Sequence, residues 1–154
     1  MTASSPPERG AAATPLILDA SVLIAVARGD SDIIGLLQAY DARNQPLVIP
    51  ALAVAGASLD ARTGEADDLL AGLELLEAAA SAPLSGAEQA IRLAGVIAAT
   101  GLDVWDAHAA AVADAAICPI LTLAAGKWRQ PSIDLGEPLH IIEIADTETQ
   151  DPDT

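Results

Sequence analysis

Aromatic residues are scarce in this chain. Among its 154 residues there is no Phe, one Tyr and two Trp, although hydrophobic residues make up 52% of the sequence. The core must therefore be built from Ala, Leu, Ile and Val. So apolar a composition excludes an intrinsically disordered protein, and the length suits one domain with a sizeable core.

Basic residues are also few. Seven Lys and Arg face 22 Asp and Glu, which gives a net charge of -15, and Lys127 is the only lysine. Non-specific binding to nucleic acid is driven by Lys and Arg. The charge therefore argues against RNA or DNA as a partner, unless bound metal ions offset it locally.

Cysteine is represented by Cys118 alone, in an apolar stretch. One cysteine excludes an internal disulfide and a zinc cluster, which favours a cytoplasmic location. Residues 1–14 show no signal-peptide pattern, and no run of about 18 apolar residues occurs, so we expect no membrane partner.

The order of apolar and polar segments predicts one folded domain over residues 15–144. An Ala-, Ser-, Thr- and Pro-rich tail (1–14) and an acidic tail (145–154) are expected to be disordered. Strands are expected at 16–18, 47–49, 119–122 and 139–144, with an extended segment at 81–84. Helices are expected at 21–28, after Asp30 or Ser31, and at 51–62, 65–79, 85–100 and 103–116, with a helical turn at 124–128. This alternation predicts a three-layer α/β/α sandwich with a mostly parallel central sheet.

Asp19 follows the apolar run Leu16-Ile17-Leu18. Sites of open parallel sheets lie at the carboxyl ends of the strands, where Asp19 would stand. The simpler interpretation is that its carboxylate only caps the helix that begins after it.

A second acidic element is Asp103-Val104-Trp105-Asp106, which precedes an Ala-rich helical stretch. Two acids three residues apart lie on one face of a helix. Asp103 can be the N-cap and Asp106 a first-turn residue, or Asp106 can face Asp19 across the ends of the strands. His108 and His140 are interpreted as structural histidines, and the sequence has no P-loop, GxGxxG, GxSxG or HExxH motif.

Three stretches in this order resemble the PIN domain, the family of the VapC-type toxin ribonucleases. They are Leu16-Ile17-Leu18-Asp19-Ala20-Ser21-Val22-Leu23, then Val48-Ile49-Pro50-Ala51-Leu52-Ala53-Val54-Ala55, and finally residues 102–113 with Pro119-Ile120-Leu121-Thr122. The resemblance covers about residues 15–144. It implies about four carboxylates that hold Mg²⁺ or Mn²⁺ for phosphodiester hydrolysis. Asp19 and Asp106 match the family's catalytic, metal-binding acids, with Asp103 as the second candidate for the helix position.

Two of the acids that the resemblance implies are missing. Gly56 stands where the family has Glu, and Ala124 stands where it has Asp after the last central strand. Gly56 is expected in mid-helix, where glycine costs about 1 kcal/mol relative to alanine. Asp60 and Asp114 lie too far along their helices to substitute and are interpreted as solvated charges. Two carboxylates can still hold one hydrated Mg²⁺ weakly.

Lys127 and Arg129 form a basic pair just after Ala124. One hypothesis is that one of them reaches the vacated pocket and binds an anion or a carboxylate. The alternative is a surface turn that Trp128 anchors to the core.

Three functions remain open at this point. The first is a PIN-like protein with an incomplete metal site, inactive or weakly active as a nuclease, that acts through a protein partner such as an antitoxin, or as the homodimer that the resemblance implies. The second is a Mg²⁺-dependent VapC-type ribonuclease that cleaves RNA. The third is an unrelated α/β binding domain in which Asp19 is only a cap.

Overall fold

The structure is a computed structural model that describes residues 13–145. The predicted tails, 1–14 and 145–154, lie outside the described residues except for 13, 14 and 145. The strands are β1 (Leu16–Leu18), β2 (Leu47–Pro50), β3 (Ala79–Ala82), β4 (Ile120–Thr122) and β5 (Ile141–Glu143). The helices are α2 (Ala20–Ala27), α3 (Ser31–Ala42), α4 (Ala51–Ala61), α5 (Gly64–Leu73), α6 (Gly86–Thr100), α7 (Val104–Ala116), the 3₁₀-helix η1 (Ala125–Trp128) and α8 (Arg129–Asp134).

The five strands form one sheet in the order β3-β2-β1-β4-β5, and every neighbouring pair is parallel. β1 is central, with Ile17 paired to Val48 on one side and to Ile120 on the other. Parallel neighbours need crossover connections, which the helices provide. The predicted α/β sandwich is confirmed, and the described sheet is parallel throughout.

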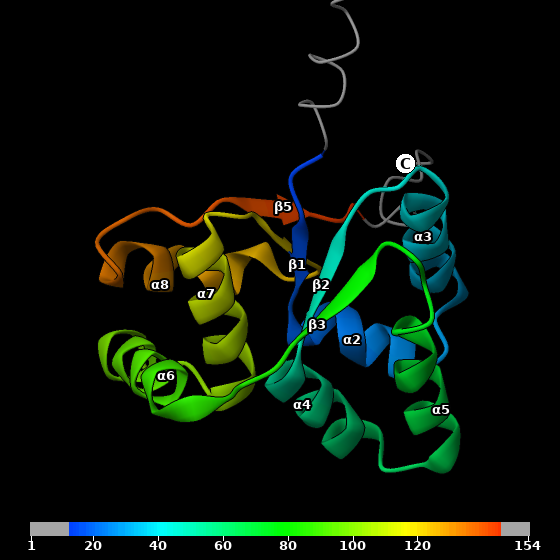
Figure 1. Ribbon diagram of the computed structural model, residues 1–154, viewed down its shortest axis with the longest axis horizontal. Helices are drawn as coiled ribbons and strands as arrows, with labels where there is room; N and C mark the ends of the chain where they lie inside the picture. Colours follow the sequence, from blue (N-terminus) through cyan, green and yellow to red (C-terminus); the bar gives the residue numbers. More distant parts are fainter. Residues whose placement is uncertain (1–12, 146–154) are drawn as a thin grey trace, which may run out of the picture.

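The sheet separates two apolar layers because successive side chains of a strand point to opposite faces. Leu16 and Leu18 pack in a cluster with α2, α3, α4 and α5, whereas Ile17 packs in a second cluster with α6, α7 and Trp128. Figure 1 shows the two groups of helices on either side of the strands, with α4 beside the ends of β1 and β2. α4 also contacts both α2 and α7, so it joins the two layers at this edge.

The segment after α5 differs from its prediction. The helix expected over 65–79 ends at Leu73, and Ala79–Ala82 forms the edge strand β3 instead. Alanine favours helix, but Ala79 pairs with Leu47 of β2, and the N–H of Ala78 donates to Asp41 Oδ1 at 2.7 Å. Pairing with a neighbouring strand outweighs the local preference.

Two smaller corrections concern α6 and α8. The sequence Ser85-x-x-Glu88 has the pattern of a capping box, which predicts that the two side chains cap the start of α6 reciprocally. This capping box does not form, because the Ser85 side chain makes no cap hydrogen bond and its N–H donates to Gln89 Oε1 at 2.8 Å. α8 was not predicted. None of the helices within residues 13–145 combines the length and apolar character that a membrane crossing demands.

Candidate functional site

The carboxyl ends of β1 and β4 are neighbours, so the residues that follow these strands meet. Asp19 follows β1 and is the N-cap of α2, and its N–H donates to Leu121 O at 3.3 Å. The Ser21 hydroxyl accepts the N–H of Leu123 at 2.9 Å and lies 3.2 Å from Thr122 Oγ1. These contacts join the start of α2 to the end of β4 and fix the position of Asp19.

The Asp19 carboxylate is completely buried and accepts hydrogen bonds on both oxygens. Oδ1 accepts from the Ser21 hydroxyl at 2.6 Å and from the Val22 N–H at 3.2 Å. Oδ2 accepts from the Trp128 indole N–H at 2.9 Å and lies 3.4 Å from Lys127 Nζ. A buried charge is tolerated when it is paired and hydrogen-bonded, so Asp19 both caps α2 and belongs to a polar network.

Asp106 reaches the same place from the first turn of α7. The N-cap of α7 is Asp103, whose Oδ1 accepts the N–H of Asp106 at 3.0 Å. The Asp106 side chain is buried, and both of its oxygens lie 3.1 Å from Lys127 Nζ. Asp103 therefore holds the start of the helix, and Asp106 contributes its carboxylate to the site.

Lys127 connects the two buried acids. It comes from η1, immediately after β4, and its side chain is 30% exposed while its ammonium contacts Asp19 and Asp106 together. The next residue, Trp128, is fully buried in the second core cluster, and its ring lies 5.6 Å from Lys127 Nζ. The geometry thus unites both interpretations of this segment, since Trp128 anchors the turn and Lys127 binds carboxylates.

The pKa of Asp106 lies above its ordinary value. Burial raises it most, the Lys127 ammonium opposes this, and the charges of Asp19 and Asp103 add to the increase. The ammonium therefore compensates only part of what it costs to bury this carboxylate.

Gly56 lies in α4 against a tryptophan that the sequence reasoning passed over. A Cβ at position 56 would stand 2.6 Å from Cγ of Trp105, closer than real Cβ atoms approach. The indole of Trp105 therefore occupies the space next to position 56, where the resemblance implies a Glu side chain. This packing explains a glycine in mid-helix, where local preference alone disfavours it.

The other positions considered for metal ligands are also accounted for. Ala124 follows β4 and offers no side-chain oxygen. Asp60 forms an ion pair with Arg28 at 2.9 Å, and Asp114 is exposed on α7. Within residues 13–145 no group of three or more acidic, histidine or cysteine side chains is arranged to hold a metal ion.

These residues do not fit the Mg²⁺ or Mn²⁺ site that the resemblance implies. Hard divalent cations need several oxygen ligands. Both oxygens of Asp106 and Oδ2 of Asp19 already contact the Lys127 ammonium. The remaining oxygen, Oδ1 of Asp19, accepts two hydrogen bonds from the start of α2.

A hollow of about 410 Å³ opens above this network. Its lining includes three acids, Asp60, Asp103 and Asp106, together with Lys127 and the exposed Leu59. Arg129 does not reach it; it begins α8 and lines a different hollow with Trp128.

His108 lies two residues beyond Asp106 in α7, on the opposite side of the helix, and makes a different contact. Its Nδ1 accepts the N–H of Leu52 at 3.1 Å, at the start of α4, where the N-cap Pro50 offers no side-chain hydrogen bond. Burial lowers the pKa of this imidazole. His108 thus caps α4 from α7.

The fold is PIN-like. A chain of VapBC2 from Rickettsia felis, in a crystal structure with a DNA fragment from their promoter, superimposes with a TM-score of 0.57 at 14% sequence identity; the match covers 84% of this chain and 98% of that chain. No protein-family profile and no curated protein sequence matches this chain. The likeness concerns the fold alone.

Two contacts of the tryptophans escaped the sequence reasoning. They are the packing of Trp105 against Gly56 and the hydrogen bond that the Trp128 indole N–H donates to Asp19. Both tryptophans of an otherwise aromatic-poor chain lie at this edge, and that concentration is the only signal that pointed to them.

Proposed function

We propose that this PIN-like protein does not catalyse metal-dependent hydrolysis of RNA and acts by binding another protein. The observation that carries the proposal is the Lys127 ammonium, 3.4 Å from Asp19 and 3.1 Å from Asp106. A cation of the chain itself stands between the two carboxylates that otherwise offer ligands to a metal ion.

The missing acids support the same conclusion. Metal-assisted hydrolysis needs ions that generate hydroxide and stabilise the leaving oxygen. Gly56 and Ala124 provide no ligand, and the indole of Trp105 lies where a side chain from position 56 would extend. A metal ion would have to displace Lys127 and then be held by two carboxylates alone.

Charge supports a protein partner over a nucleic acid. The chain carries a net charge of -15, and three carboxylates line the hollow above the network. This surface repels phosphate and attracts cationic side chains. We therefore propose a partner segment, such as part of an antitoxin, that brings Lys or Arg to Asp60 and Asp103 and an apolar side chain to Leu59.

Calorimetric titration of Mg²⁺ and Mn²⁺ into the purified protein tests the inactive site. We expect no saturable binding below about 10 mM metal and no cleavage of an RNA panel. This result would show that the Asp19 and Asp106 carboxylates do not form a metal-binding site. Saturable binding that Asp19→Asn abolishes, together with RNA cleavage, would establish the ribonuclease alternative instead.

The protein partner is tested separately. The tagged chain and an Asp60→Lys, Asp103→Lys variant are compared for capture of host proteins, with Asp32→Lys, Asp68→Lys as the charge-matched control outside the hollow. A protein retained by the wild type and the control but lost from the first variant supports the proposal. The predicted homodimer is measured by light scattering on the same samples.

A further inference from the structure

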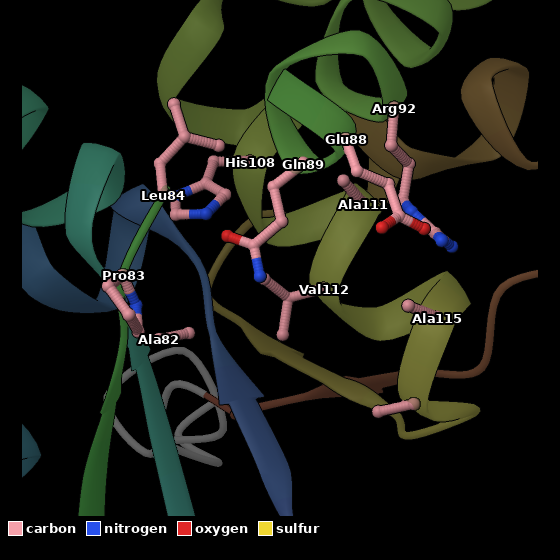
Figure 2. A pocket seen from close by; sticks show the side chains of 11 residues that line it. Ala82, Pro83, Leu84, Glu88, Gln89, Arg92, His108, Ala111, Val112 and Ala115 are labelled. Atoms are coloured by element: carbon pink, nitrogen blue, oxygen red, sulfur yellow. The ribbon is translucent and has the colours of Figure 1, made fainter. Parts of the chain in front are cut away.

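A second cavity lies beside His108. It has a volume of about 410 Å³ and is formed by the segment before α6 together with α6 and α7. Figure 2 shows Leu84 and His108 at one end, Glu88 and Arg92 at the other, and Gln89 between them over Val112. None of these residues belongs to the Asp19 network.

The inner end of this cavity holds a buried polar group. His108 is 2% exposed, and its Nδ1 accepts the N–H of Leu52. Nδ1 therefore carries no proton, and the proton of the neutral imidazole is on Nε2. No acceptor for Nε2–H is found in the described part of the chain, although a buried donor normally has one.

Two further donors come from α6. The Oε1 atom of Gln89 accepts the Ser85 N–H. The two amide hydrogens of Gln89 are therefore on Nε2, which points toward Val112 in Figure 2. Arg92 lies one turn further along α6 and forms no ion pair with any residue between 13 and 145. Three hydrogen-bond donors thus line this cavity, with His108 at one end, Arg92 at the other and Gln89 between them, and the remaining lining is mostly apolar.

We propose that this cavity binds a small organic carboxylate with an apolar body. The carboxylate would accept from the Arg92 guanidinium and the Gln89 amide, as charge-assisted hydrogen bonds favour. A second acceptor atom, or the other carboxylate oxygen, would take the Nε2–H of His108. The apolar body would contact Leu84, Val112 and the alanines of α7.

The net charge of the chain narrows the class of anion that this cavity would bind. A negatively charged surface disfavours anions in general, so binding here depends on Arg92, the one cation among the residues that line the cavity. Glu88 lies beside it and would repel a ligand with several negative charges. The site therefore favours a monocarboxylate over a phosphate or a dicarboxylate.

Protein NMR with a graded set of acids tests the site. Acetate, hexanoate, benzoate and 3-phenylpropionate are titrated into ¹⁵N-labelled protein, and the backbone amides of α6 and α7 and the His108 ring nitrogens are followed. We expect affinity to rise with the apolar body, and the Nε2 signal to shift while Nδ1 stays unprotonated. Hexanamide, which lacks the charge, is expected to bind at least tenfold more weakly than hexanoate.

Two variants locate the binding. Arg92→Gln is expected to weaken hexanoate binding about tenfold, and Val112→Trp to abolish it by filling the cavity. Arg43→Gln, with the same charge change on an exposed arginine outside the cavity, leaves binding unchanged. The amide spectrum verifies the fold of each variant. Because Arg92 is exposed, Arg92→Gln is expected to fold and tests the proposal even if Val112→Trp does not fold. Absence of shifts with all four acids, equal binding of the amide, or unchanged binding in Arg92→Gln would overturn the proposal.

Discussion

The Asp19 network and the His108 cavity each contain a buried polar side chain, but the two differ in how many partners that side chain has. In Asp19, Oδ1 accepts two hydrogen bonds, and Oδ2 accepts one hydrogen bond and forms an ion pair with Lys127. His108 has a partner on Nδ1 and none on Nε2 within the described residues. A buried group whose hydrogen-bonding capacity is filled by the chain stabilises the fold, whereas one with capacity left over can recognise a ligand.

The largest loss of stability is expected from Asp19→Ala. The substitution leaves the indole N–H of Trp128, the Ser21 hydroxyl and the Lys127 ammonium without this acceptor in a buried place. Removing one member of a buried charge pair typically costs about 3–5 kcal/mol. Urea unfolding measures the loss. The matched control is Asp30→Ala, which removes the exposed N-cap of α3 and is expected to cost about 1 kcal/mol; equal losses would mean that Asp19 is a cap and nothing more.

Lys127→Met measures what the ion pairs of Lys127 contribute to stability, while Asp19 remains as the N-cap of α2. We expect a loss of about 2 kcal/mol at neutral pH, less than for a fully buried partner because the lysine is partly exposed. The pKa of Asp106 is already raised by burial, and Lys127 lowers it, so the pKa rises further in the variant.

The pH dependence of Lys127→Met follows from this shift. A folded-state pKa above the unfolded value means that the folded protein holds a proton the unfolded chain releases. The stability linked to that proton is fully present below pH 3.8, the ordinary value for Asp106, and is lost as the pH rises through the raised pKa. Thermal unfolding of both proteins between pH 4 and 8 should show the difference growing with pH; a constant difference would contradict the ion pair.

Gly56→Ala tests whether the packing at position 56 excludes a side chain. The added Cβ would meet Trp105 at 2.6 Å, and overpacking typically costs about 1–3 kcal/mol. Gly95→Ala in α6 is the matched control, since a Cβ there meets nothing within 4 Å and alanine is expected to stabilise the helix by up to about 1 kcal/mol. If Gly56→Ala also stabilises, the indole of Trp105 does not occupy this position.

The smallest change in stability, and in its pH dependence, is expected from His108→Asn. The Oδ1 of asparagine can accept the Leu52 N–H in place of Nδ1, but the side chain does not titrate. Because burial lowers the pKa of His108 below 6.5, the wild type loses stability as the pH falls from 6.5 through that lowered pKa. Unfolding free energies at pH 5 and pH 7.5 should therefore differ by less in the variant than in the wild type.

Local signals predicted much of the fold. The apolar run before Asp19 and the spacing of Asp103 and Asp106 lie within a few residues of the feature they specify. Each predicted helix and strand has a counterpart, although the helix expected over 65–79 ends at Leu73. The edge strand β3 (Ala79–Ala82) was predicted only in part, as an extended segment at 81–84, because alanine favours helix in isolation and the strand conformation depends on pairing with β2.

The sequence by itself determined where the acids stand and which family ligands are absent, because caps, strand ends and motif positions are properties of short segments. Only the tertiary structure decided that Lys127 lies between Asp19 and Asp106, that Trp105 covers Gly56, and that His108 caps α4. These contacts join residues from separate elements. Their geometry follows from how the helices pack on the sheet, a non-local property that no short segment of the sequence encodes.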